Sequence, residues 1–250
     1  RRKMKKININ GTLNLMIAAK RVNVPRFIFL STYGVYGKTD SFPLKEEDRK
    51  KPYTPYGKDK LKAEQLCTAY AKKHNINLTI VRPSLIAGPG VRNTSILITL
   101  YLAMGLGNDN VMYMSGNGDT RFQLLDPEDA AEAFYKIYKA GKKSYGEILN
   151  IGSDNVPTQM EQIVKIKETC KLDFAVKHIT PIKAWLYSLL FKPSNVNYFT
   201  REHRLFIFHS VYLDCQKIKT LIGWHPKKDN IEILTETVKW YKEKLGNIKN

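Results

Sequence analysis

RFIFLSTYGVYG, residues 26–37, is the stretch of sequence that decides the fold. From Arg26 to Leu30 bulky apolar side chains follow one another, which is typical of a strand buried in a parallel sheet. The run ends at the small hydroxyl residues Ser31 and Thr32. In open α/β sheets, ligands bind in the crevice at the carboxyl ends of the strands. The pattern therefore places two hydroxyl groups where a ligand would meet the sheet.

Helix and strand patterns alternate on both sides of this stretch. Apolar residues recur at helical spacing over 8–21, before the strand, and over 56–73, after it. Further strands are expected at 78–82 (LTIVR) and 148–151 (ILNI). The remaining expected elements are helices at about 94–106, 129–139, 158–169, 214–221 and 231–241, and a strand at 176–179. This alternation predicts an α/β protein with a mostly parallel sheet.

The composition indicates a compact protein with a basic surface. A chain of 250 residues with 43% hydrophobic content can bury one core and a small additional lobe. The net charge of +18 would suit a polyanion, but the basic residues are spread along every expected helix, apart from a cluster in residues 1–6. We interpret them as a solvated lysine-rich surface and expect no nucleic-acid partner. Nucleic-acid binding stays as an alternative, and it would show a steep salt dependence.

Cysteine and histidine spacing points away from metal chemistry and disulfides. Cys67, Cys170 and Cys215 lie far apart, and no HxxxH or HExxH pattern occurs. The most apolar stretch, 184–191, is too short to span a bilayer, and no signal-peptide pattern opens the chain. We therefore expect a cytoplasmic protein without metal or membrane span. Because the first residue is not Met and the pattern begins part-way, we also expect a longer product.

Tyr56 and Lys60 form the most interesting chemical pair. A spacing of four places both side chains on one face of a helix. The same spacing occurs twice more, in Tyr135 with Lys139 and in Tyr138 with Lys142. Only the first pair stands at a helix start, shortly after the hydroxyl pair and before the next strand. We interpret the two later pairs as surface residues.

Six ordered segments carry a family resemblance. They are NINGT at 8–12 with Asn14-Leu15, RFIFLSTYGVYG at 26–37, YTPYGKDKLKAEQL at 53–66, VRPSLIAGPG at 81–90, GNGDTRFQLLDPEDAAEAF at 116–134 and LIGWHPK at 221–227. Together they resemble the extended short-chain dehydrogenase/reductase family, which includes the NAD-dependent epimerases and dehydratases. The resemblance covers nearly the whole chain.

The resemblance implies a Rossmann-like fold with a doubly wound parallel sheet and a smaller C-terminal substrate-binding lobe. Only the second half of the sheet is expected here. Residues 1–150 would form a partial NAD(P)-binding domain that carries the Tyr-Lys pair. Residues 151–250 would form most of the substrate lobe and the C-terminal helices, with the two lobes interleaved in sequence.

The resemblance also implies catalytic roles. Tyr56 would exchange a proton with the substrate oxygen, while Lys60 would bind the nicotinamide ribose. A phenol has a reference pKa of about 10, which a nearby ammonium lowers by roughly 1 to 3 units. Thr32 would be the third catalytic residue, because it lies three positions before the Val35-Tyr36-Gly37 landmark. Its neighbour Ser31 is the less favoured choice.

NAD or NADP is the implied cofactor. Its expected contacts are Leu30, Ser31, Tyr56, Lys60, Pro83, Ser84 and Leu85. Tyr33 and Arg121 are expected to bind the substrate, the latter where sugar-nucleotide members place an arginine against a diphosphate. The family's dimers pair through the helices that correspond to 8–21 and 56–73, so the resemblance implies a homodimer.

Three departures from the family limit the assignment. No GxxGxxG or GxGxxG occurs, so the cofactor affinity of this chain and its preference for NAD or NADP stay open. Tyr33-Gly34 replaces the Asp-Glu pair of nucleotide-sugar dehydratases, which argues against dehydration. The Asn of the epimerases' RxFN pattern is absent after Arg82, which weakens the epimerase alternative.

The expected function is hydride transfer at a secondary alcohol or carbonyl of a small molecule. The sequence RPSLIAGPG at 82–90 and the aromatic region 185–208 resemble steroid-dehydrogenase-like or carbonyl-reductase-like members of the family. A buried core of the lobe would explain the same aromatic residues equally well. A nucleotide-sugar epimerase of the same family is one alternative. A non-catalytic dinucleotide-binding or truncated protein is the other.

Overall fold

The computed structural model of the chain describes residues 2–39, 41–91, 111–180, 182–183, 186 and 209–246. These residues belong to two compact units that alternate along the sequence. The first unit comprises Arg1–Ser84, Glu128–Gly152 and Leu213–His225. The second comprises Leu85–Pro127, Ser153–Tyr212 and Pro226–Asn250. Each unit therefore combines three separate stretches of sequence.

The first unit contains a parallel sheet of three strands. They are β1 (Arg26–Leu30), β2 (Asn77–Pro83) and β6 (Ile148–Ile151), in the order β1-β2-β6. Phe29 is aligned with Ile80, and Arg82 with Asn150. All three strands end at the same edge of the sheet, which is the edge where α/β proteins bind ligands. The prediction of an α/β fold with a parallel sheet is confirmed.

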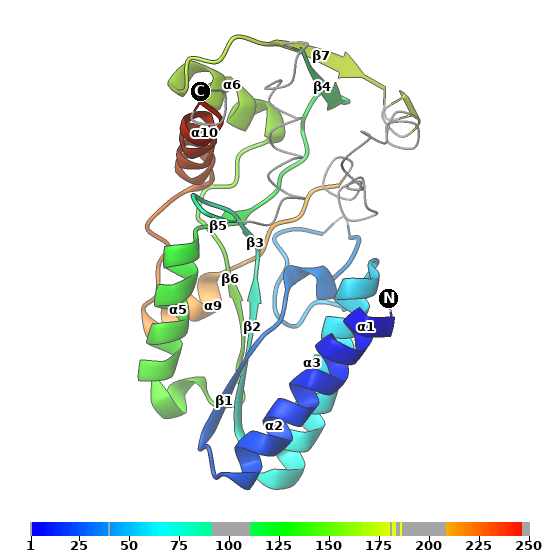
Figure 1. Cartoon of the computed structure of the whole chain (residues 1–250), viewed down its shortest axis with the longest axis vertical. Coiled ribbons are helices and arrows are strands. Elements are labelled where there is room, and N and C mark those ends of the chain that lie inside the picture. The colour runs from blue at the N-terminus through cyan, green and yellow to red at the C-terminus, as the bar shows by residue number, and fades with distance from the viewer. Residues whose placement is uncertain are drawn as a thin grey trace. The chain divides into compact units, whose positions relative to one another are not determined.

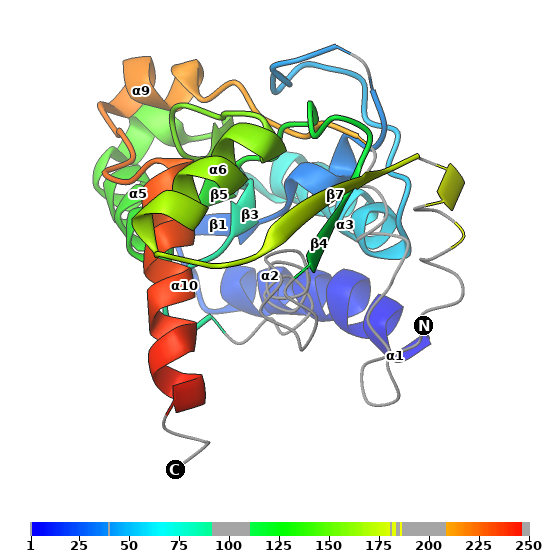
Figure 2. The same ribbon diagram turned by 90° about the horizontal axis from the view of Figure 1, so that it is seen from above.

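Helices cover this sheet on both faces (Figures 1 and 2). On one face lie α2 (Thr12–Arg21) and α3 (Pro55–His74), side by side. On the other face lie α5 (Pro127–Lys139) and α9 (Gln216–Ile222). Two short 3-10 helices, η2 (Tyr33–Val35) and η3 (Gly141–Ser144), also belong to this unit.

Helix α3 has clear start and stop signals in its sequence. Thr54 accepts a hydrogen bond from the Gly57 amide at 3.0 Å, and Pro55 follows as the first helical residue. At the other end, Asn75 adopts the left-handed conformation (φ 52°), which ends the helix. The buried face of α3 packs with α2, β1 and β2 in one core cluster: Met16, Phe29, Ala63, Cys67, Ala71, Leu78 and Ile80.

The first helical segment begins earlier than the expected residue 8 and is not a regular α-helix throughout. It runs through α1 (Arg2–Lys5) and a π-helical turn, η1 (Lys6–Gly11), before α2. The Thr12 hydroxyl donates to the Asn8 carbonyl at 2.8 Å. Such side-chain bonds to the preceding turn compete with the helical ladder and bend helices. A 3.6-residue period alone does not reveal a π turn.

Two small parallel ladders and two helices are the named elements of the second unit among the described residues. Strand β3 (Leu85–Ile86) pairs with β5 (Leu124–Leu125), and β4 (Val111–Ser115) pairs with β7 (Ala175–Ile179). Helices α6 (Gln159–Thr169) and α10 (Asn230–Gly246) pack on each other. Their apolar faces join one core: Ala87, Met112, Met114, Leu124, Ile163, Ile166, Cys170, Leu172, Phe174, Ile233, Leu234 and Val238.

Most expected elements agree with the structure within a few residues. Strand β4 is the main correction, because no strand was expected at residues 111–115. The helix expected at 94–106 and nearly all of the aromatic region 185–208 lie outside the described residues. Among the described residues, no helix is both long and apolar enough to span a bilayer.

Candidate active site

The carboxyl ends of the three strands in the first unit form the candidate site. Strand β1 ends at Leu30, and the next two residues, Ser31 and Thr32, are buried, with 2% and 7% of their surface exposed. Thr32 Oγ1 accepts a hydrogen bond from the Gly34 amide at 3.2 Å and so caps η2. A hydroxyl that accepts one bond can still donate its own proton. The strand end therefore holds an oriented hydroxyl, as expected.

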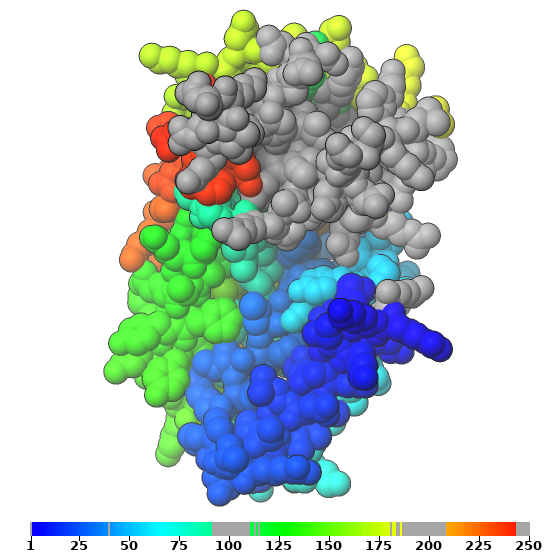
Figure 3. Space-filling view, viewed as in Figure 1, coloured from blue at the N-terminus to red at the C-terminus, as the bar shows by residue number. Residues whose placement is uncertain are grey.

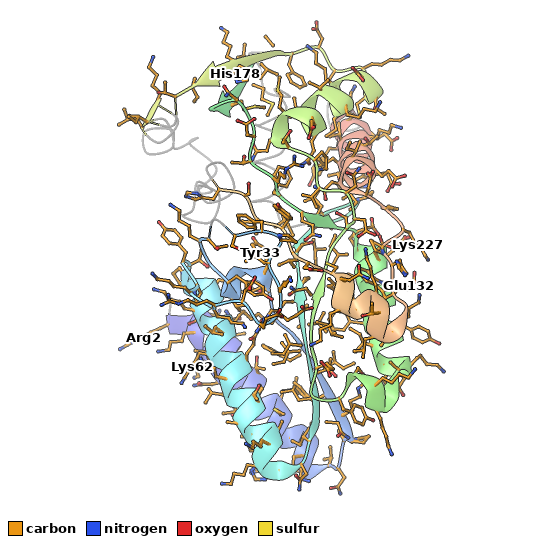
Figure 4. All side chains as sticks on the ribbon, turned by 180° about the vertical axis from the view of Figure 1, so that it is seen from behind. Arg2, Tyr33, Lys62, Glu132, His178 and Lys227 are labelled. Atoms are coloured by element: carbon orange, nitrogen blue, oxygen red, sulfur yellow. The ribbon has the colours of Figure 1, made fainter. Side chains whose placement is uncertain are left out.

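Lys60 joins helix α3 to this strand end. Its Nζ donates to the Leu30 carbonyl at 2.7 Å. The same Nζ lies 4.9 Å from the ring centre of Phe29 and 5.9 Å from that of Tyr56. By contrast, Lys62 points away from the sheet (Figure 4). The structure therefore brings Tyr56 and Lys60 together at the end of β1.

Burial sets the acid-base behaviour of Lys60. Desolvation lowers its pKa below the usual lysine value, and the carboxylate of Glu64 and the thiol of Cys67 oppose this shift. A lysine with a lowered pKa exchanges its proton more readily near neutral pH. Tyr56 itself is 36% exposed, so its ring is accessible from outside the unit.

Two glycines bring the first turn of α3 close to η2. A Cβ added to Gly57 would lie only 2.3 Å from the Gly34 carbonyl oxygen. Real Cβ atoms essentially never come so close, so a glycine is needed at this contact. Gly57 follows Tyr56, and Gly34 follows Thr32 by two residues. The contact therefore fixes the spacing between the two candidate catalytic residues. Tyr33 lies in η2 beside it (Figure 4).

A buried polar network below the site was not predicted. Glu64 accepts from Ser31 Oγ at 2.5 Å and forms an ion pair with Arg82, Nη2 to Oε2 at 2.7 Å. Glu64 and Arg82 expose only 4% and 1% of their surface. A signal was present in the sequence, because an arginine in a buried apolar strand requires a partner. The Ser31 side chain is thereby assigned to this network.

Pro83 and Ser84 also lie at the carboxyl ends of the strands. Pro83 is the last residue of β2, and the Ser84 amide donates to the Ile151 carbonyl at 2.8 Å. Ser84 is 5% exposed, and within the described residues its hydroxyl oxygen has no hydrogen-bond partner. A buried hydroxyl without a partner is costly unless a ligand satisfies it.

Leu85 and Arg121 belong to the second unit, whereas the other predicted site residues belong to the first. Leu85 starts β3, and Arg121 Nη1 donates to the Val156 carbonyl at 2.6 Å. The two later Tyr-Lys pairs lie on or just beyond α5. Tyr135 and Tyr138 are 61% and 64% exposed there, in agreement with their interpretation as surface residues.

Comparison with known proteins identifies the family. A sequence model described as the NAD dependent epimerase/dehydratase family matches residues 1–152. The chain belongs to the NAD-dependent epimerase/dehydratase family. The predicted resemblance is thereby confirmed.

Two of the curated relatives carry the names of enzymes that act on nucleotide sugars. Human dTDP-D-glucose 4,6-dehydratase is 28% identical over 244 residues, which is 98% of this chain and 64% of the relative. UDP-glucuronate 4-epimerase of Thermodesulfobacterium geofontis is 26% identical over 247 residues, 97% of this chain and 67% of the relative. The chain spans 64% of the length of the human relative.

Solved structures confirm the Rossmann-type fold. UDP-glucuronic acid 4-epimerase from Bacillus cereus, in complex with NAD, superposes with a TM-score of 0.73 at 22% identity, covering 94% of this chain and 67% of the other. dTDP-glucose 4,6-dehydratase from Bacillus anthracis, also with NAD, gives 0.71 at 22% identity, covering 96% and 68%. RMD from Pseudomonas aeruginosa, in complex with NADPH, gives 0.72 at 20% identity, covering 96% and 74%.

Proposed function

We propose that this protein catalyses NAD(P)-dependent oxidation and reduction at a secondary alcohol of a nucleotide sugar, with epimerisation as the net reaction. The observation that carries the proposal is the position of Lys60, whose Nζ bonds to the end of β1 and lies near the Tyr56 ring. The relatives' names favour nucleotide sugars over the steroid or simple carbonyl substrates expected from the sequence.

The proposed chemistry uses three side chains. Tyr56 would remove the proton from the substrate hydroxyl, and NAD(P), when bound, would supply the acceptor for the hydride that leaves the carbon. The Lys60 ammonium stabilises the phenolate of Tyr56, because the two groups lie close together in a partly desolvated site. Thr32 donates a hydrogen bond to the substrate oxygen. In the return step, the hydride would go back to the opposite face of the same carbon and the proton on Tyr56 would go back to that oxygen, so that the alcohol is restored with inverted configuration.

The residues after Thr32 favour epimerisation over dehydration. Loss of water from a sugar requires an acid and a base in addition to the tyrosine, and Tyr33-Gly34 supplies no carboxylate. The fold does not force this choice, because a Cβ at Gly34 would meet its nearest neighbour, the Thr32 side chain, at an ordinary 3.5 Å. We therefore propose that the missing carboxylates limit the reaction to oxidation and reduction.

The residues present fit the nicotinamide half of the cofactor. Lys60 offers an ammonium donor at the strand ends, and Ser84 offers a buried hydroxyl that has no partner among the described residues. We propose that these two side chains bind the nicotinamide riboside, with Leu30 and Pro83 beside it. Ser31, already bonded to Glu64, would support the site from below.

Substrate binding is proposed for Tyr33 and Arg121. The guanidinium of Arg121 suits a diphosphate, because its planar fork can bind two oxygens at once. The relatives named above carry uridine or thymidine diphosphate sugars in their names, which is the chemistry that such an arginine would recognise.

We also propose that the layer formed by residues 2–24 and α3 pairs with a second copy of the chain. This layer lies at the surface (Figure 3) and exposes apolar side chains: Ile7 by 59%, Leu15 by 64% and Val22 by 72%. Exposed apolar residues along one helix are typical of a protein interface. The molar mass in sedimentation equilibrium tests the proposal: a monomer at micromolar concentration would contradict it.

Product analysis tests the proposed reaction. UDP- and dTDP-sugars are incubated with the protein and NAD or NADP in D2O, and the products are examined by mass spectrometry and NMR. Epimerisation gives an isomer of the same mass without carbon-bound deuterium, because the hydride returns from the cofactor. A product that is lighter by one water would show a dehydratase and would contradict the proposal.

A further inference from the structure

A chain of buried polar contacts connects the carboxyl ends of all three strands in the first unit. Ser31, just after β1, donates to Glu64 on α3. Glu64 receives two bonds from Arg82 on β2, from Nε at 3.0 Å and from Nη2 at 2.7 Å. Arg82 Nη1 bonds to the Tyr36 hydroxyl at 3.0 Å, and this hydroxyl donates to Asn150 on β6 at 2.7 Å.

The centre of this network is an ion pair with almost complete hydrogen bonding. Arg82 also donates to the Glu46 carbonyl at 3.0 Å, so each nitrogen of its guanidinium has an acceptor. Such a pair is expensive to bury, and apolar side chains of similar volume usually stabilise a core at least as well. Stability is therefore a weak reason for placing these charges below the site.

Glu64 lies one helical turn after Lys60 on α3, so the ion pair and the candidate catalytic lysine share one helix. Lys60 bonds to Leu30, and Glu64 bonds to Ser31, the next residue. Two successive turns of α3 are thus fastened to two successive residues at the end of β1. Together the contacts hold α3 in register with the strand that leads to Thr32.

Charges around this helix face reinforce the geometry. Lys60 faces Tyr56, Glu64 and Cys67 on its own helix, and the apolar ring of Phe29 on β1. Glu64 in turn faces Arg82 on β2, with Lys50 from the preceding loop nearby. The carboxylate of Glu64 raises the pKa of Lys60 against the larger effect of burial.

We infer that Glu64 and Arg82 are positioning residues for Lys60 and Tyr56: their ion pair holds the first turns of α3 against the end of β1 and keeps a negative charge beside the lysine. The inference rests on the proposed function only in so far as its kinetic test requires that activity. Its second test uses the protein without cofactor or substrate.

The decisive variant is Glu64→Gln with Arg82→Met. It removes both charges together, so no uncompensated charge is buried, and the new amide oxygen can still accept from Ser31. The matched control is Glu147→Gln with Lys217→Met, which removes an ion pair of 2.7 Å in the same unit, with side chains 34% and 40% exposed. Circular dichroism and thermal unfolding establish that both double variants are folded.

Two measurements follow on the folded proteins. We expect kcat of the Glu64→Gln/Arg82→Met variant to fall about 100-fold with KM within about threefold, because a misplacement near 1 Å costs this much. The second measurement is the acetylation of Lys60 as a function of pH, detected by mass spectrometry. We expect the midpoint of this curve to move to lower pH in the Glu64→Gln/Arg82→Met variant. The control variant should change neither quantity.

A folded variant with unchanged kcat and an unchanged Lys60 midpoint would overturn the inference and leave the pair a purely structural feature. If the double variant does not fold, Ser31→Ala provides the test, because it deletes only the bond from β1 to Glu64. It should lower kcat about tenfold and also lower the unfolding midpoint, because the buried Glu64 carboxylate loses a donor, and circular dichroism establishes that the variant is folded at the assay temperature. If the wild-type protein is inactive on every nucleotide sugar, the proposed function fails, and the Lys60 midpoint still decides this inference.

Discussion

Substitution of Gly57 by alanine should damage the site although the new residue is a better helix former. In an exposed helix interior, glycine to alanine stabilises by about 1 kcal/mol. Here the added Cβ would lie 2.3 Å from the Gly34 carbonyl oxygen, 3.0 Å from its carbonyl carbon and 3.2 Å from Pro52 Cβ. Two of these three neighbours are backbone atoms, so they cannot rotate away.

The expected magnitudes follow from this overlap. Carbon atoms in proteins pack at about 3.5 to 4.0 Å, so α3 and η2 must separate by about 1 Å. Overpacking of this kind costs about 1–3 kcal/mol, which outweighs the gain in helix propensity. Tyr56 precedes Gly57 directly, and a displacement of about 1 Å costs on the order of 100-fold in rate. We therefore expect lower stability and a kcat/KM reduced by about two orders of magnitude.

Gly34→Ala is the matched control on the other side of the same contact. Its Cβ would meet the Thr32 side chain at 3.5 Å and Gly57 Cα at 3.8 Å, which are ordinary distances. Urea unfolding and steady-state kinetics on the two variants provide the assay, and Gly34→Ala should remain within about 0.5 kcal/mol of wild type. Equal behaviour of the two variants would refute the reasoning, because of the two glycines only Gly57 would bring an added Cβ closer than 3.4 Å to its neighbours.

Three further substitutions test other parts of the account. Burial raises the pKa of Tyr36 to about 12, so the folded state keeps a proton that the unfolded chain loses above pH 10, and stability falls as pH rises from about 10 to 12. Tyr36→Phe should be less stable than wild type at pH 9. In urea unfolding, this difference in stability between the two proteins should be smaller by about 1 kcal/mol at pH 11. Asn75→Ala should cost about 1 kcal/mol, whereas Asn75→Gly should not, because alanine is strained at φ 52°; a thermal shift of equal size in both would contradict this. Met16→Ala should cost about 2–5 kcal/mol in urea unfolding, since Met16 is fully buried, and a cost below 1 kcal/mol would show that the core cluster is loosely packed.

Local signals explain why much of the first unit could be predicted. Strands β1 and β6 have the expected bounds, because each is a short apolar run that ends at small or turn-forming residues. Helix α3 was expected because apolar residues recur at helical spacing over 56–73, and the structure shows that Thr54 and Pro55 start it. These features depend on residues close together in sequence.

Features that depend on distant residues were missed. Strand β4 forms only through its pairing with β7, and nothing within VMYMS specifies that partner. The ion pair of Glu64 and Arg82 joins a helix to a strand, so a sequence pattern shows the unexplained charge but not its partner. The close approach of Gly34 and Gly57 is likewise visible only in three dimensions.

The most direct test of the account is the comparison of Tyr56→Phe with Tyr135→Phe. Both tyrosines precede a lysine by four residues, but Tyr56 lies at the strand ends with Lys60, whereas Tyr135 is 61% exposed on α5. With NAD or NADP and a nucleotide sugar that the wild-type protein converts, Tyr56→Phe should lower kcat/KM by about 10²- to 10⁴-fold, and Tyr135→Phe should leave it unchanged. Undiminished activity of a folded Tyr56→Phe variant would contradict the assignment of the active site.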